Sequence, residues 1–240
     1  QELIPAQLLD QSGLPSLADA LSKLHNPRPD DPVNLLLEGK HPAVKRLVME
    51  EMVAHQLGML QKRAGQKAFH APRLGGQTLF EKLQDSLPFN LTGAQKRVIG
   101  ELMGDIKQAH PMLRLVQGDV GSGKTLVAAA AALAAIESGY QVALMAPTEL
   151  LAERHRENFH HWLAPLGIKV HWLAGSLGVK ARRETNAALA DGSAHIVVGT
   201  HALFQEAVQF HRLGLTIIDE QHRFGVQQRL ALREKGREDN

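Results

Sequence analysis

Cysteine is absent from the 240 residues, which excludes disulfide frameworks, thiolate zinc sites, iron–sulfur clusters and cysteine nucleophiles. Long apolar runs are also missing, because the longest, residues 126–136, falls far short of the roughly 20 residues that a membrane-spanning helix needs. With 44% hydrophobic and 22% charged residues, the composition is that of a globular protein and excludes a disordered or collagen-like chain. We therefore expect a cytoplasmic protein with no membrane partner.

Neither sign of charge is in excess. The 27 Lys and Arg residues against 25 Asp and Glu residues leave a net charge of only +2. Dedicated nucleic-acid modules usually carry a strong basic excess. The charge balance therefore neither demonstrates nucleic-acid binding nor forbids a local basic patch, and the 13 histidines show no metal-ligand spacing.

The sequence pattern changes near residue 85 and predicts an α/β fold in two parts. Residues 1–85 read as a helical spacer, with a long helix that begins at Pro42 and stops near Gly65. Residues 86–240 alternate short apolar runs with helical stretches, which is typical of a parallel sheet flanked by helices. The expected strands are residues 113–117, 142–146, 168–172, 196–198 and 215–218.

The sharpest signal is a phosphate-binding pattern, G-x-x-x-x-G-K-[ST], between an expected strand and an expected helix. Its members are Gly118, Asp119, Val120, Gly121, Ser122, Gly123, Lys124 and Thr125. Glycines let the backbone curl so that successive N–H groups point at one anion, and the helix N-terminus adds partial positive charge. We expect Lys124 to reach the β and γ phosphates and Thr125 to bind Mg²⁺.

An acidic pair supplies the second half of such a site. Asp219 and Glu220 directly follow the apolar run 215–218. We expect Asp219 to hold Mg²⁺ through water, and Glu220 to orient and deprotonate the attacking water. Phosphoryl transfer depends on positioning and charge neutralisation, so the predicted catalytic residues are Lys124, Thr125, Asp219 and Glu220.

ATP is favoured over GTP, because the Asn-Lys-x-Asp segment that reads guanine is absent. Upstream of the loop, Phe89, Thr92 and Gln95 form a candidate adenine site. A glutamine amide can pair with the N6 donor and N7 acceptor of adenine, and Phe89 could stack on the base. Thr92 reads equally well as a helix N-cap and Gln95 as a solvated first-turn residue.

Six segments resemble motifs of the superfamily 2 helicases, in the order found in that family. They are LPFNLTGAQ (87–95), LVQGDVGSGKT (115–125), MAPTELLAERH (145–155), WLAGS (172–176), VGTHALF (198–204) and IIDEQHRFGVQQR (217–229). The resemblance implies a RecA-like first motor lobe over residues 86–240, after a linker from a wedge domain. It implies a DNA helicase or translocase that couples ATP hydrolysis to movement on duplex DNA and remodels replication forks and Holliday junctions.

The same resemblance implies residues on the nucleic-acid side. The expected DNA contacts are Thr148, Gly175, Ser176, Thr200 and His201, and the expected coupling residues are Gln221 and His222. Each DNA candidate is also explained as a plain cap or turn. Two related translocases, the transcription–repair coupling factor and the primosomal helicase, remain alternatives, as does a non-motor P-loop ATPase.

The implied partners are branched or duplex DNA, a second RecA-like lobe and a wedge domain. The chain starts at Gln1 and ends 20 residues after Glu220 (240 − 220), so we expect an excised piece of a longer bacterial protein. Without the second lobe we expect it to bind nucleotide weakly and to hydrolyse it poorly.

Overall fold

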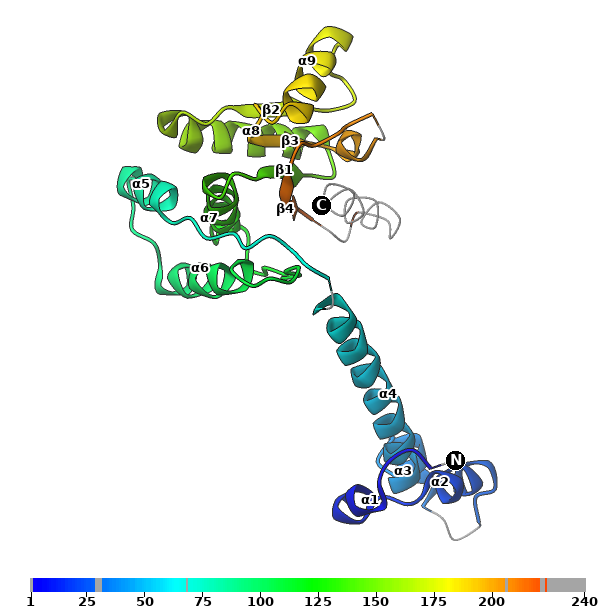
Figure 1. Ribbon diagram of the computed structural model, residues 1–240. Coiled ribbons are helices and arrows are strands. Elements are labelled where there is room, and N and C mark those ends of the chain that lie inside the picture. Colours follow the sequence, from blue (N-terminus) through cyan, green and yellow to red (C-terminus); the bar gives the residue numbers. More distant parts are fainter. Residues whose placement is uncertain (1, 29–31, 68, 206, 221–222, 224–240) are drawn as a thin grey trace. The chain divides into compact units, whose positions relative to one another are not determined.

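The computed structural model describes residues 2–28, 32–67, 69–205, 207–220 and 223 (Figure 1). The chain divides into two compact units, Gln1–Phe69 and His70–Asn240. The boundary between the units thus lies before residue 85, where the sequence pattern changes. The reason is that α5 (Thr78–Ser86) buries Phe80 and Leu83 in the core of the second unit and so belongs to it.

The first unit is helical, as predicted for this part of the chain. It comprises α1 (Ala6–Ser12), α2 (Leu17–His25), α3 (Val33–Leu37) and α4 (Pro42–Lys67). Helix α2 packs on α4, with Ala20 and Ala43 fully buried. Arg46 of α4 is also buried, and the carboxylates of Glu2 and Glu50 pair with its guanidinium, as a buried charge requires. Among the described helices, none combines the length and the hydropathy that crossing a bilayer requires.

The second unit is a parallel α/β structure. Its strands are β1 (Gln141–Met145), β2 (Val170–Leu173), β3 (Ile196–Gly199) and β4 (Leu213–Ile218), in the order β2-β3-β1-β4. All three strand pairs are parallel. Its helices are α5, α6 (Gly93–Ile106), α7 (Lys124–Glu137), α8 (Glu149–Leu163) and α9 (Val179–Ala190), with short 3₁₀ helices η1 (Ala164–Leu166) and η2 (His201–Phe204). The predicted class, a parallel sheet flanked by helices, is confirmed.

One predicted strand is wrong. Residues 113–117 make no ladder bonds within the described chain, and Leu113 and Leu115 are 81% and 59% exposed. Arg114 instead pairs with Asp105 and Glu101 of α6, at 2.5 and 3.0 Å. These ion pairs hold the segment against α6 rather than along an edge of the sheet.

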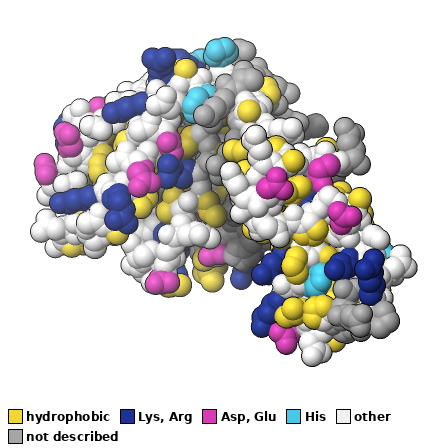
Figure 2. All heavy atoms as spheres, turned by 90° about the horizontal axis from the view of Figure 1, so that it is seen from below, with side chains coloured by type: hydrophobic (Ala, Val, Ile, Leu, Met, Phe, Trp, Pro, Cys, Tyr) yellow, Lys and Arg dark blue, Asp and Glu magenta, His cyan; other side chains and the backbone are white. Residues whose placement is uncertain are grey.

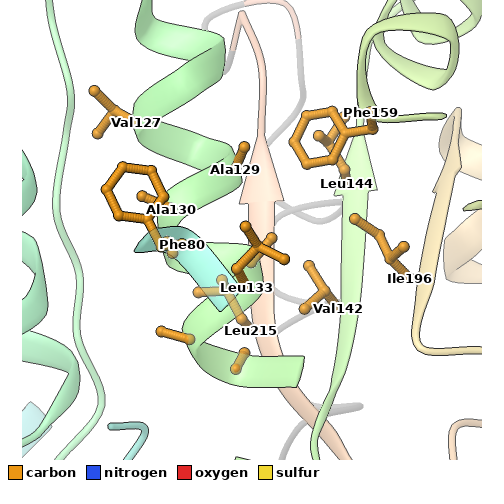
Figure 3. Close-up of a cluster of buried hydrophobic side chains, with 14 of the residues drawn as sticks. Phe80, Val127, Ala129, Ala130, Leu133, Val142, Leu144, Phe159, Ile196 and Leu215 are labelled. Carbon is orange, nitrogen blue, oxygen red and sulfur yellow. The ribbon is translucent and has the colours of Figure 1, made fainter. Parts of the chain in front are cut away.

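Helix α7 forms the centre of the core, because its small side chains let it approach the sheet closely. Ala129, Ala130 and Leu133 are fully buried, and they lie beside Val142 of β1 and Leu215 of β4 (Figure 3). Since α7 begins at Lys124, this close packing sets where the phosphate-binding loop lies relative to the ends of the strands.

The side chain of Gln141, the first residue of β1, links three segments of the chain through hydrogen bonds. Its buried side-chain Nε2 donates to the carbonyls of Leu189 and Ala194 at 2.9 and 2.8 Å. Its Oε1 accepts from the backbone N–H of Arg212 at 2.9 Å. The start of β1 is thereby joined to the end of α9 and to the residue that precedes β4.

We predict that Gln141→Leu lowers the free energy of unfolding of the second unit by about 1–3 kcal/mol, because it removes three hydrogen bonds and leaves the buried Ala194 carbonyl without the partner that the glutamine supplied, whereas the Leu189 carbonyl still accepts from the N–H of His211. Denaturation followed by tryptophan fluorescence measures this unit alone, since Trp162 and Trp172 both lie in it. Gln108→Leu removes one exposed glutamine bond and should change the value by less than about 0.5 kcal/mol. Equal changes in the free energy of unfolding for the two substitutions would contradict the role of Gln141 in linking these segments.

Candidate nucleotide-binding and nucleic-acid site

The glycine-rich loop has the backbone that its sequence predicts. Gly121 and Gly123 have φ angles of 81° and 84°, in the left-handed region that glycine tolerates. Gly123 is the N-cap of α7, so the first N–H groups of that helix face the loop. The ammonium of Lys124 reaches back over the loop and donates to the carbonyls of Gly118 and Asp119 at 2.6 and 2.9 Å.

Thr92 and Gln95 form a capping box at the start of α6. The hydroxyl of Thr92 accepts from the N–H of Gln95 at 3.2 Å, and the Gln95 amide oxygen accepts from the N–H of Thr92 at 2.9 Å. The N-cap interpretation of Thr92 is therefore confirmed. The Gln95 amide also donates to the Ser122 carbonyl at 3.0 Å, which ties this segment to the phosphate-binding loop. Adenine recognition by Gln95 stays a prediction.

A pocket of about 440 Å³ joins these two segments. Phe89, which is 52% exposed, lines it together with Thr92, Gln95 and the loop. Asn158 and Trp162 of α8 also line it. The side chain of Trp162 packs against the core and also faces this pocket. Asn158 and Trp162 lie four residues apart, which places both on one face of the helix, and this spacing was the signal that the sequence offered.

Asp219 lies directly after β4, where a hydrogen bond to β1 fixes its backbone. Its N–H donates to the Met145 carbonyl at 2.8 Å. Its Oδ2 lies 2.7 Å from Nε2 of His155, and its Oδ1 accepts from the N–H of Glu220 at 3.0 Å. The hydrogen bond with His155 is the main cause that lowers the pKa of Asp219, against the opposing effect of burial, and the charge of Lys124 lowers this pKa further.

Glu220 has a left-handed backbone, with φ at 50°. This conformation is uncommon for a residue other than glycine and costs of order 1–3 kcal/mol. Such strain clusters at functional sites, and here it sits on the predicted catalytic carboxylate. The coupling candidates Gln221 and His222 lie outside the described residues.

The donor set suits magnesium bound together with a nucleotide. No three His, Cys, Asp or Glu side chains in the described part of the chain are placed to hold a metal ion by themselves. Mg²⁺ commonly needs only one or two protein oxygens, since phosphates and waters complete its octahedron. The hydroxyl of Thr125 is an oxygen of this kind, and the Asp219 carboxylate, whose pKa is lowered mainly by the hydrogen bond with His155, would hold the ion through a bound water.

The nucleic-acid candidates gather around Glu149, at the carboxyl ends of the strands. Thr148 caps α8, with its hydroxyl accepting from the N–H of Leu151 at 3.3 Å. Ser176 donates its N–H and its hydroxyl to the Glu149 carboxylate, at 3.1 and 2.5 Å, and these bonds lower the pKa of Glu149. The charge of exposed His201 acts on the same carboxylate. The neighbour of Ser176 in this turn is Gly175, which is also exposed.

Thr200 differs from this group. It is only 2% exposed, and its hydroxyl oxygen is buried without a partner among the described residues. Its N–H donates to the Leu173 carbonyl at 3.2 Å. Thr200 therefore does not present its side chain to solvent in this structure, and its contact with DNA stays a prediction. On the face drawn in Figure 2, basic side chains lie in separate groups among acidic ones.

Loop, acidic pair and parallel sheet together define a P-loop nucleotide-binding domain of the RecA-like type. The chain belongs to the DEAD/DEAH box helicase family, whose model matches residues 92–238.

The relatives are bacterial helicases. The chain is 57% identical to the ATP-dependent DNA helicase RecG of Escherichia coli K12 over 239 residues, which cover 99% of this chain and 34% of that protein. It is 56% identical to RecG of Haemophilus influenzae over 92% of this chain and 32% of the relative. The chain thus spans about a third of the length of these relatives. The resemblance that the motifs implied is confirmed.

Solved structures of helicases share the fold of this chain. A structure of RecG bound to a three-way DNA junction matches with a TM-score of 0.79 and 38% identity, over 94% of this chain and 30% of that one. The UvsW helicase of bacteriophage T4 shares the fold, with a TM-score of 0.51 and 15% identity over 77% of this chain and 66% of that one.

We predict that Gly123→Ala weakens binding of a fluorescent ATP analogue at least tenfold. The positive φ of Gly123 costs an alanine about 1–2 kcal/mol, and the added Cβ collides with the Gln95 amide. Gly178→Ala is the matched control, because Gly178 has an ordinary φ and open space for a Cβ. Unchanged affinity in Gly123→Ala, measured by fluorescence titration, would contradict the assignment of the loop.

Proposed function

We propose that this chain is the ATP-binding motor lobe of a bacterial DNA helicase or translocase. The parent protein couples ATP hydrolysis to movement on duplex DNA and remodels forks and Holliday junctions. The observation that carries the proposal is the packing of α7, which begins at the phosphate-binding loop, on β4, which leads directly into Asp219, since a loop for phosphates and a carboxylate for magnesium must meet at one nucleotide. The relatives named RecG support the choice of DNA as the track and the bacterial cytoplasm as the place of action.

Nucleotide binding would use donors that the folded chain already orients. The ammonium of Lys124 exchanges the carbonyls of Gly118 and Asp119 for phosphate oxygens. The curled backbone of residues 118–123 and the N-terminus of α7 supply the remaining donors. Phe89 and Trp162 offer apolar surface to the base at the other end of the pocket. Thr125 and Asp219 would hold a magnesium ion, whose charge would help to neutralise that of the phosphates.

Hydrolysis would depend on Glu220. Its carboxylate orients a water molecule and accepts its proton, while Asp219, ionised at neutral pH, keeps its charge for the metal. An arginine finger supplied from outside the lobe is worth about 10³–10⁵ in rate for enzymes of this type. We therefore expect slow hydrolysis by the lobe alone and faster hydrolysis when the second lobe and DNA are present.

DNA would bind at the opposite end of α8 from the nucleotide pocket. The exposed N-terminus of α8 at Thr148 and exposed His201 are suited to phosphates. The N–H and hydroxyl of Ser176, next to Gly175, would have to exchange the Glu149 carboxylate for a phosphate. A solved relative bound to a three-way junction supports branched DNA as the partner. The second lobe and the wedge domain are further partners that the parent protein would supply.

We predict that Lys124→Ala and Glu220→Gln fail at different steps. Lys124→Ala removes the phosphate charge partner, so binding of a fluorescent ATP analogue should weaken at least tenfold. Glu220→Gln keeps the binding donors, so binding should persist. ATPase activity on forked DNA should fall at least 100-fold in either variant, because a positioned general base contributes about 10²–10⁴. The ATPase assay requires a chain that includes the second lobe.

Lys107→Ala serves as a control, since this residue is an exposed C-cap of α6 outside the pocket. Comparing forked DNA, duplex DNA and RNA as stimulants tests the choice of track. Stimulation by RNA alone would reject the DNA helicase. Phosphate transfer to another acceptor would favour a non-motor ATPase, and full function in both variants would leave the loop a purely structural role.

A further inference from the structure

His155 makes a contact between two elements that the nucleotide site needs. Its Nε2 lies 2.7 Å from Oδ2 of Asp219, a residue 64 positions later in the chain. The imidazole is only 14% exposed. Its other nitrogen, Nδ1, is buried and has no hydrogen-bond partner in the part of the chain that the structure describes. The polar interaction of this ring is thus directed at the Asp219 carboxylate.

The ring is carried on a rigid support. Ala152, Phe159 and Leu163 of α8 are fully buried, and they lie at helical spacings of three, four and eight residues from His155. They therefore share one face of α8, which packs on β2 and β3. Phe159 appears among the buried core side chains in Figure 3. Because this face is anchored, the imidazole has little freedom to follow a moving carboxylate.

The Asp219 carboxylate is held from two sides. Its Oδ1 accepts from the N–H of Glu220, which is a bond within its own turn. Its Oδ2 meets His155, which fixes the side chain to a different element. Loss of the imidazole would leave only the local bond, so the carboxylate could rotate among staggered rotamers.

We propose that His155 is a positioning residue that fixes the Asp219 carboxylate for the magnesium ion of a bound nucleotide. The inference rests on the proposed function of the site. Partners behind a metal-binding carboxylate orient it, and their loss typically costs 10–100-fold in metal affinity. A purely structural pair would instead affect folding and all ligand binding alike.

The test uses the 240-residue chain and a fluorescent ATP analogue, titrated with Mg²⁺ and measured separately in EDTA. In His155→Ala, the Mg²⁺ concentration for half-maximal binding should rise about tenfold or more. Affinity in EDTA should change by less than about twofold, because the contacts of the loop do not involve this ring. His155→Gln should restore the Mg²⁺ dependence to within about threefold of the original, since its amide nitrogen can occupy the place of Nε2.

His160→Ala is the matched control, because His160 is an exposed histidine of the same helix and does not line the pocket. An unchanged Mg²⁺ dependence in His155→Ala overturns the inference. So does an equal loss of affinity in EDTA accompanied by a lower melting temperature, or a failure of His155→Gln to restore the Mg²⁺ dependence. If His155→Ala does not fold, the result for His155→Gln decides. Failure of the unsubstituted chain to bind the analogue counts against the proposed function.

Discussion

The parallel ladder between β1 and β4 is the contact on which the candidate site depends. Its last hydrogen bond, from the N–H of Asp219 to the carbonyl of Met145, brings the acidic pair to the end of β1. The chain leaves β1 there toward α8, so Asp219 and His155 meet within 2.7 Å. Glu220 is forced into a left-handed backbone just beyond this bond. One register thus sets the position of the metal ligand, its partner and the predicted base.

Helix α7 supplies the second constraint, because its position determines where phosphates can bind. Its alanines allow the backbone to lie close to β1 and β4, and larger side chains would move its N-terminus away from the strand ends. The same close approach places the start of α7, at Lys124, on the side of the sheet where β4 leads into Asp219. Core packing and site geometry are therefore one property of this unit, and the Gln95 bond to Ser122 adds a polar tie to the loop.

Helix α8 reaches both candidate surfaces. Its N-cap, Thr148, is a DNA candidate and its first residue, Glu149, binds another candidate, Ser176, while Asn158 and Trp162 face the nucleotide pocket. His155 lies between these ends and contacts Asp219. A helix with a buried face moves as one body, so this geometry offers a direct physical connection between the two surfaces.

The sequence by itself determined the α/β class, the phosphate-binding loop and the acidic pair, because each depends on local patterns: glycines at fixed spacing, apolar strands and a helix start. Only the tertiary structure decided how distant residues meet. It revealed Asn158 and Trp162 in the pocket, enclosed Thr200, and held residues 113–117 against α6 through Arg114. The pairing of His155 with Asp219 belongs here too, since no local pattern encodes a contact between residues 64 positions apart; the strand register and helix packing create it.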